Sequence, residues 1–105
     1  MTFFIAPLDS GVTRVALQGS VDIFTIGLLR PELLLVIRAR PAVVEVDFSS
    51  LRSINTSGMQ VLVSFCTDLS RIGTRIVIKG LQGQPLQRFR AALVEAIRHA
   101  SGSAN

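Results

Sequence analysis

Four consecutive small residues bring hydroxyl, amide and glycine chemistry together in the middle of the chain: Asn55, Thr56, Ser57 and Gly58. They follow a β-branched segment and precede an amphipathic one, so we expect them where a strand passes into a helix. Ser57 with Gln60 fits the S-x-x-Q capping box, in which the serine hydroxyl accepts a hydrogen bond from the first helical turn. The simplest role for Ser57 is therefore to cap a helix.

The same position also suits a regulated serine. A helix N-terminus presents backbone N–H donors and the positive end of the helix dipole, so it tolerates a phosphate. Gly58 has no side chain beside the Ser57 hydroxyl, which would give a kinase room to approach. A phosphate adds a charge of about −1.5 to −2, enough to disrupt an apolar interface. The residues alone leave capping and phosphorylation open.

Other residues that could carry catalysis or bind a metal are sparse. The sequence has no phosphate-binding loop, no dinucleotide fingerprint and no G-x-S-x-G nucleophile elbow. The single histidine, His99, lies near the C-terminus. The single cysteine, Cys66, lies on a predicted apolar stripe, where burial would suppress its reactivity. We therefore expect a non-enzymatic protein with no metal and no cofactor.

Composition indicates one domain that lies inside the cell. The 105 residues are 49% hydrophobic and 17% charged, unlike a disordered chain. The net charge of +4 is dispersed rather than clustered with aromatic residues, which argues against nucleic-acid binding. With no secretory signal, and a longest apolar run of residues 33–37, we expect no membrane insertion and a cytoplasmic location. Residues 1–100 are the predicted single domain and residues 101–105 a disordered tail.

The elements that would position these residues follow from hydrophobic patterning and turn signals. Residues 2–8 and 12–18 indicate a β-hairpin, and the segment from Gly19 to Asp22 ends its second strand. A helix is expected from Leu28 to about Arg40, because Pro31 then falls in the first turn, where its missing N–H does no harm. The remaining predicted elements are a strand at 43–48, a helix at 57–72 before Gly73, a strand at 75–79 and a helix at 85–100.

This order, β-β-α-β-α-β-α, predicts an α/β fold. Two consecutive β-α-β units favour parallel pairing, and the opening hairpin adds an antiparallel pair. We therefore expect a small mixed β-sheet of about four strands, with about three helices packed on it. The predicted core consists of apolar side chains from the later strands and the inner helix faces: Val44, Val46, Leu62, Phe65, Cys66, Leu69, Val77, Phe89 and Leu93.

The predicted first helix is apolar around most of its axis. Its aliphatic residues point in nearly all directions: Leu28, Leu29, Leu33, Leu34, Leu35, Val36 and Ile37. A helix of this kind requires burial on more than one side, and in so small a domain one side would face outwards. This predicts a homodimer or another partner contact through the first helix, unless the long side chains of Arg30 and Arg38 cover it.

From Val43 to Gly80 the sequence resembles the core of the STAS family (sulfate transporter and anti-sigma factor antagonist). That core is a strand ending in Asp, a short turn, an Asp-Ser-Ser-Gly-like tetrad, a helix, a glycine and a strand. An upstream Leu-x-Gly-x-x-Asp motif also matches, so the resemblance covers about residues 2–99. The matching positions are Leu17, Gly19, Asp22, Val44, Val46, Asp47, Asn55, Thr56, Ser57, Gly58, Leu62, Leu69 and Gly73, followed by residues 75–79.

The resemblance implies a function in transcription regulation. In the anti-sigma factor antagonists of this family, the serine directly before the tetrad glycine is phosphorylated by a partner anti-sigma factor that is also a serine kinase; that serine matches Ser57. Asn55 departs from the aspartate that the family usually has. Other STAS proteins act, without phosphorylation, as scaffolds in signalling or as cytoplasmic subunits of transport systems, and this is the alternative. The implied partner-binding residues are Asp22, Asn55, Thr56, Ser57, Gly58, Met59 and Gln60.

Overall fold

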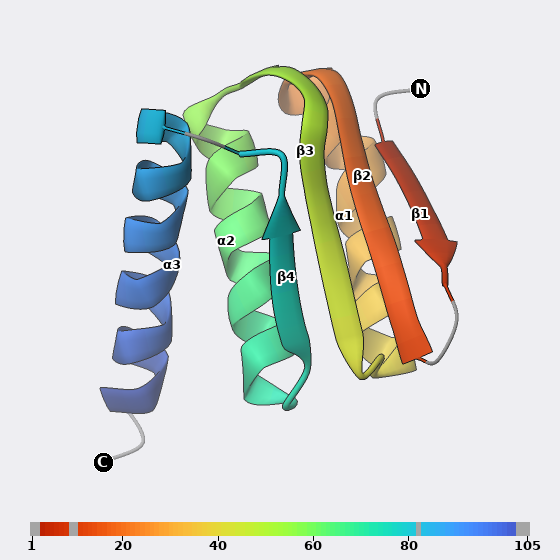
Figure 1. Cartoon of the computed structure of the whole chain (residues 1–105), viewed down its shortest axis with the longest axis vertical. Coiled ribbons are helices and arrows are strands. Elements are labelled where there is room, and N and C mark those ends of the chain that lie inside the picture. The colour runs from red at the N-terminus through yellow and green to blue at the C-terminus, as the bar shows by residue number, and fades with distance from the viewer. Residues whose placement is uncertain (1–2, 9–10, 82, 103–105) are drawn as a thin grey trace.

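Strands and helices follow one another in the predicted order, β-β-α-β-α-β-α (Figure 1). The computed structural model describes residues 3–8, 11–81 and 83–102. The last helix includes the first two residues of the predicted tail, and residues 103–105 lie outside the described residues. The elements are β1 (Phe3–Pro7), β2 (Val12–Val21), α1 (Ile23–Ala39), β3 (Val43–Ile54), α2 (Thr56–Arg71), β4 (Arg75–Lys79) and α3 (Gly83–Gly102).

The strands form one mixed sheet in the order β1-β2-β3-β4, which confirms the predicted fold class. β1 pairs antiparallel with β2, whereas β2 with β3 and β3 with β4 are parallel pairs. α1 and α2 lie on the same face of the sheet, and α3 packs against α2 beside β4 (Figure 1). Because β2 and β3 are parallel neighbours, their carboxyl ends reach the same edge of the sheet, and α1 and α2 begin there.

One apolar core lies between the sheet and the helices. Leu93 is partly buried at its margin, and the ring of Phe89 meets the ring of Phe48 edge-on, with centroids 5.4 Å apart. The prediction for Val77 is wrong: Val77 alternates with two core-facing isoleucines and is paired with Glu45, which places it on the open face of the sheet. The other predicted core residues are buried as expected: Val44, Val46, Leu62, Phe65, Cys66, Leu69 and Phe89.

β2 and β3 both run further than predicted. The residues from Gly19 to Val21, expected to end the second strand, instead pair with the last residues of β3, up to Ile54. Two register shifts interrupt this pairing, and Gly19 takes a positive φ of 64°, which suits glycine at an irregular position of a strand. The extension of β3 is polar and lacks hydrophobic alternation, so the local pattern of residues 49–54 indicates a turn.

α1 begins at Ile23 rather than at Leu28, because the Asp22 side chain caps the helix there. The predicted late start is therefore wrong, and Pro31 lies in the helix interior. Proline has no N–H, so the carbonyl of Gly27 lacks its usual helical partner. Both Gly27 and Pro31 are exposed, so water can reach that carbonyl.

α2 lies within one residue of its predicted bounds and directs its apolar stripe to the core. Gly73 follows it with a φ of 83°, as expected for a glycine that ends a helix. Because the stripe from Leu62 to Leu69 faces inwards, the opposite side of α2 and its first turn face solvent. The fold therefore exposes the segment that the sequence singles out.

Candidate functional site

Two helix N-termini meet at one edge of the sheet. Val21 and Ile54 are paired at the ends of β2 and β3, and each is followed by a residue that caps the next helix: Asp22 for α1 and Asn55 for α2. The backbone N–H of Asn55 donates to the Val21 carbonyl at 3.3 Å. Strand pairing thus brings two predicted site residues, Asp22 and Asn55, to the same edge.

Asp22 closes the N-terminus of α1 with a carboxylate. Its Oδ1 accepts hydrogen bonds from the backbone N–H of Thr25 at 3.0 Å, the Thr25 hydroxyl at 3.1 Å and the backbone N–H of Phe24 at 3.1 Å. These donors, the Thr25 N–H above all, hold the pKa of Asp22 below its ordinary value of 3.8. The N-terminus of α1 therefore carries a negative charge at neutral pH.

Asn55, and not Ser57, caps α2. Its Oδ1 accepts a hydrogen bond from the backbone N–H of Gly58 at 2.7 Å. The predicted capping box of Ser57 with Gln60 is wrong, because α2 begins at Thr56 and Ser57 is already its second residue. The N–H groups of these first two residues have no intrahelical partner, and the first turn holds no acidic side chain. The N-terminus of α2 is therefore uncharged apart from its helix dipole.

Ser57 presents its hydroxyl to solvent. Its side chain is exposed and makes no hydrogen bond within the part of the chain that the structure describes. Thr56 and Gln60 beside it are also exposed, and Met59 is half-buried. A phosphate added to a hydroxyl at a helix N-terminus can accept hydrogen bonds from free backbone N–H groups, and the helix dipole there favours its negative charge.

Gly58 allows close packing of α2 on the strands and does not open space around Ser57. A Cβ atom at Gly58 would lie 2.9 Å from Cγ1 of both Val21 and Ile54, and 3.2 Å from Oδ1 of Asn55. The missing side chain lets the first turn of α2 lie directly on the ends of the two strands. The sequence-based interpretation, in which this glycine clears space around Ser57, therefore does not fit the structure, because Gly58 is buried and faces inwards.

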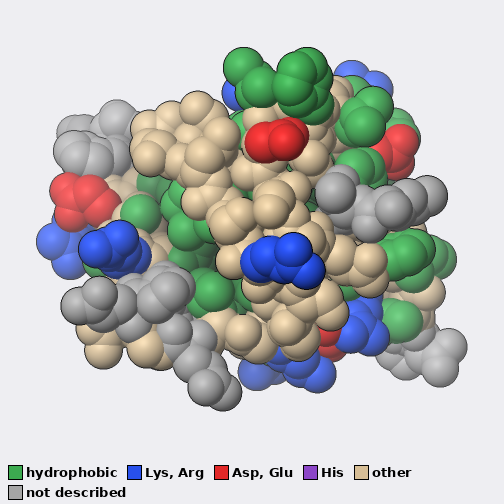
Figure 2. Space-filling view, turned by 90° about the horizontal axis from the view of Figure 1, so that it is seen from above, with side chains coloured by type: hydrophobic (Ala, Val, Ile, Leu, Met, Phe, Trp, Pro, Cys, Tyr) green, Lys and Arg blue, Asp and Glu red, His purple; other side chains and the backbone are tan. Residues whose placement is uncertain are grey.

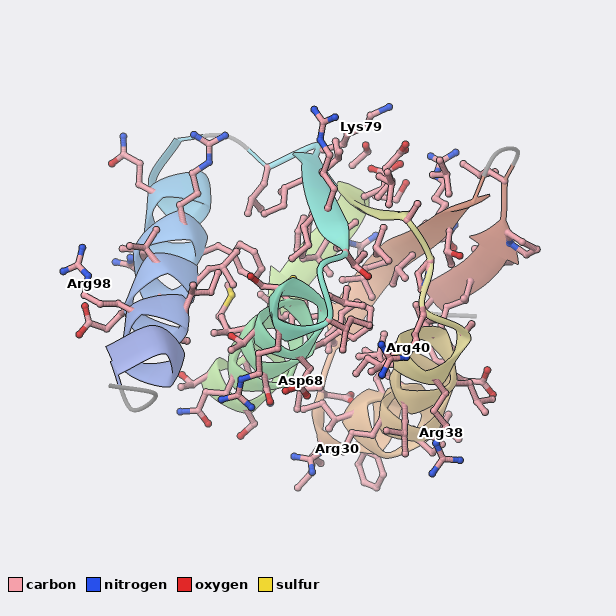
Figure 3. The ribbon with its side chains drawn as sticks, turned by 90° about the horizontal axis from the view of Figure 1, so that it is seen from below. Arg30, Arg38, Arg40, Asp68, Lys79 and Arg98 are labelled. Carbon is pink, nitrogen blue, oxygen red and sulfur yellow. The ribbon has the colours of Figure 1, made fainter. Side chains whose placement is uncertain are left out.

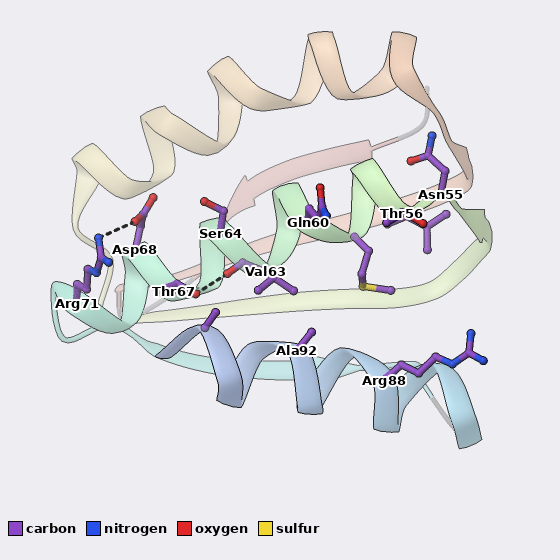
Figure 4. A pocket seen from close by; sticks show the side chains of 13 residues that line it. Asn55, Thr56, Gln60, Val63, Ser64, Thr67, Asp68, Arg71, Arg88 and Ala92 are labelled. Atoms are coloured by element: carbon purple, nitrogen blue, oxygen red, sulfur yellow. Dashed lines mark hydrogen bonds and ion pairs between the residues drawn. The ribbon is translucent and has the colours of Figure 1, made fainter. Parts of the chain in front are cut away.

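The exposed face of α2 is a ridge between two open grooves. A groove of about 880 Å³ runs between α1 and α2, and Ser57 of α2 and Arg30 of α1 are among the residues that line it. A groove of about 660 Å³ runs between α2 and α3, where Arg88 borders it (Figure 4). Gln60 borders both grooves. Of the other predicted residues, Asn55, Thr56 and Met59 line the second groove, whereas Asp22 and Gly58 line neither.

A second polar cluster, on the open face of the sheet, was not singled out from the sequence. Asp47 accepts hydrogen bonds from the Ser49 hydroxyl and, at 2.8 Å, from the Ser49 backbone N–H, and it pairs with Arg14. Ser49 chiefly, with Arg14, lowers the pKa of Asp47 to about 2. Glu45 lies 3.7 Å from Arg14 and 3.3 Å from Lys79. These groups satisfy one another, which indicates that the cluster holds β2, β3 and β4 in register.

The described side chains offer few candidates for chemistry other than binding. Cys66 is buried, and burial raises its pKa to about 12, so its thiol is inert. Within the described ranges, no three His, Cys, Asp or Glu side chains come together in a way that could hold a metal ion. The side chain of His99 lies outside what the structure describes. None of the helices, as far as they are described, is long and apolar enough to cross a membrane.

The fold is that of a known domain family. The STAS domain model matches residues 4–100, and the chain belongs to this family. No curated protein sequence matches the chain.

Solved structures show the same fold in anti-sigma factor antagonists. Unphosphorylated SpoIIAA, an anti-sigma factor antagonist, superposes with a TM-score of 0.74 at 15% identity, covering 84% of this chain and 81% of its own. SpoIIAA of Bacillus in the phosphorylated form gives 0.75 at 15% identity, covering 89% and 86%. An anti-sigma factor antagonist from Mycobacterium paratuberculosis gives 0.67 at 19% identity, covering 94% and 80%.

Proposed function

We propose that this STAS domain is an anti-sigma factor antagonist that works in the cytoplasm by binding, not by catalysis. Its partner is an anti-sigma factor with serine kinase activity. The unphosphorylated domain binds this partner and frees the sigma factor, and phosphorylation of Ser57 releases the domain. One observation carries the proposal: Ser57 places an exposed, unbonded hydroxyl at an uncharged helix N-terminus, on a ridge between two grooves.

The proposed docking surface is the edge where the two caps meet. Asn55, Thr56, Ser57 and Gln60 are exposed there, and Met59 contributes a half-buried apolar side chain. Asp22 lies at the same edge and adds a negative charge. Gly58 contributes indirectly, because it sets how closely the α2 N-terminus lies on the strands. This mixture of polar groups and open grooves suits reversible binding of another protein.

The local electrostatics support a phosphate on Ser57. The free N–H groups of the first turn and the dipole of α2 favour a negative group there. The neutral amide of Asn55 adds no repulsion, and the groove that Ser57 lines contains one charge of each sign, Arg30 and Asp68, so the support comes from the helix end itself. The phosphate would leave the domain itself folded, while its charge and hydration would disrupt an interface that had closed over Ser57.

A matched pair of variants on α2 tests the switch. Ser57→Asp should fold normally and lose the kinase, since it adds a fixed negative charge at the proposed interface. Ser70→Asp adds the same charge to an exposed serine in the last turn of the same helix and should keep the kinase. Phosphopeptide mass spectrometry of the protein from its native cell should find the phosphate on Ser57. Binding of Ser57→Asp at wild-type strength, with no phosphate on Ser57 in cells, would refute the proposal.

A substitution at Asn55 provides a second test of phosphorylation. Asn55→Asp restores the acid that anti-sigma factor antagonists usually have, and aspartate caps helices about as well as asparagine. We therefore expect an unchanged fold and a faster rate of phosphate transfer from the partner kinase to Ser57, measured with purified proteins. An unchanged or slower rate would show that the amide is not what limits transfer here.

Asn55 also favours the alternative function. A domain without the family aspartate fits a STAS subunit of a transport system, or a signalling scaffold, in which phosphate plays no part. The same exposed α2 ridge would then dock on an ATPase or on another scaffold protein. Under this alternative Ser57→Ala and wild type behave alike in cells, and affinity capture recovers transport proteins instead of a serine kinase.

A further inference from the structure

The outer face of α1 is a continuous apolar surface. Its central stripe is Phe24, Leu28, Pro31 and Leu35, spaced at i, i+4, i+7 and i+11, so that the four side chains line one side of the helix. Phe24 is 82% exposed, Leu28 67% and Leu35 56%. Figure 2 shows exposed hydrophobic side chains gathered at one edge of the molecule. Monomers rarely leave an apolar patch of several hundred Å² uncovered.

The stripe is complementary to itself when two copies run antiparallel. A two-fold axis at the midpoint of the stripe sets Phe24 of one copy against Leu35 of the other, and Leu28 against Pro31. From Phe24 to Leu35 the stripe thus sets apolar side chains against apolar side chains, as a self-complementary, isologous interface requires.

The charges at the ends of α1 also favour the antiparallel arrangement. The N-terminal end carries the ionised Asp22, and the C-terminal end carries Arg38, which projects outwards in Figure 3, and Arg40, which points towards the middle of the molecule. Antiparallel packing brings the acidic end of one copy beside the basic end of the other. Parallel packing would set like charges together at both ends, at a cost in free energy.

We infer that the outer face of α1 binds a second copy of this chain, as an antiparallel helix pair centred between Leu28 and Pro31. The inference does not rest on the proposed kinase partner. Gly27, Pro31 and Leu34 also form the α1 wall of the groove that Ser57 lines, so the dimer covers part of that groove. A single pair of helices is a small interface for a specific complex, so we expect a weak dimer that depends on concentration.

Sedimentation velocity over a range of concentrations tests self-association with the domain alone. Wild type should shift from monomer to dimer as its concentration rises, and Leu28→Glu should stay monomeric with an unchanged circular dichroism spectrum. Val94→Glu changes an exposed apolar residue on α3, outside the stripe, and should dimerise like wild type. A wild type that stays monomeric throughout overturns the inference. So does a monomer that binds vesicles of anionic phospholipid, since the stripe would then be a membrane-binding face.

Disulfide trapping tests the orientation. In the antiparallel pair, Phe24→Cys mixed with Leu35→Cys should cross-link, because the two positions lie opposite each other. Phe24→Cys alone should not, because its two copies lie about 16 Å apart along the helix axis. Native Cys66 is buried and is the same in every sample. Cross-linking of Phe24→Cys alone, without cross-linking of the mixture, would show a parallel pair and overturn the proposed geometry.

Discussion

The N-termini of α1 and α2 are built alike but are chemically opposite. A single residue separates each helix from the parallel strand before it, and the side chain of that residue, Asp22 or Asn55, caps the helix. The carboxylate of Asp22 accepts three hydrogen bonds and places a negative charge at the N-terminus of α1. The amide oxygen of Asn55 accepts one hydrogen bond and adds no charge to α2. This difference indicates that a helix N-terminus can accept an anion only when its capping residue is uncharged and leaves backbone N–H groups without a partner.

The two helices also differ in what they turn outwards. α1 exposes an apolar stripe around Leu28, and α2 exposes a polar ridge around Ser57. The fold therefore offers two surfaces of different character: one suits a helix of matching shape, and the other suits a polar, reversible interface. Each of the following predictions changes one helix and uses the other, where possible, as its control.

The largest effect is expected in the core. Leu62→Ala removes a fully buried α2 side chain and should lower the free energy of unfolding by about 2–5 kcal/mol. Leu35→Ala truncates an exposed side chain on α1 and should change stability by no more than about 0.5 kcal/mol in dilute solution. Urea denaturation measures both. Equal losses would mean that the outer face of α1 is covered within the monomer.

The glycines of the two helices should respond in opposite directions. Gly58→Ala forces a methyl group against Val21 and Ile54 and should destabilise the domain by about 1–3 kcal/mol. Gly27→Ala adds a methyl group in open space within α1 and should stabilise the domain by about 0.5–1 kcal/mol. Thermal denaturation of the two variants gives the comparison. A stabilised Gly58→Ala would mean that α2 does not lie as closely on the strands as the structure shows.

The two caps should differ in their response to acid. The folded-state pKa of Asp22 is lowered, so its stabilising contribution is present above the ordinary carboxyl pKa near 3.8 and is lost as the pH falls through the folded value. Asp22→Asn keeps a cap that cannot titrate, so its stability should fall less than that of wild type between pH 5 and pH 2. Asn55→Ala should lose about 1 kcal/mol at every pH. Parallel acid sensitivity of wild type and Asp22→Asn would contradict the role given to this carboxylate.

The smallest effect is expected at Ser57, the proposed phosphorylation site. Ser57→Ala should change the free energy of unfolding by no more than about 0.5 kcal/mol, because Ser57 is exposed and does not cap α2. A serine cap would have cost about 1 kcal/mol on removal. Chemical denaturation therefore separates the two sequence-based interpretations of this residue. A loss of stability as large as that of Asn55→Ala would indicate that Ser57 caps α2 after all.

The sequence by itself determined the order of the elements, the fold class and most of the core. Alternating or helical spacing of apolar residues reports burial directly, which is why the stripe from Leu62 to Leu69, the strand at 75–79 and the glycine at 73 were predicted correctly. The same local pattern placed Ser57 at the start of a helix, but it left open which side of the first helix faces outwards, where the structure places Leu35.

Only the tertiary structure decided what depends on residues far apart in the chain. Residues 49–54 are polar and become strand because β2 lies beside them, and Val77 faces the open side because it is in register with Glu45. The start of α1 at Ile23 and the cap at Asn55 follow from where those strands end. Gly58 is required by two side chains, Val21 and Ile54, that meet only in the folded sheet. Local periodicity records whether a residue is buried, but pairing between distant segments decides which neighbour buries it.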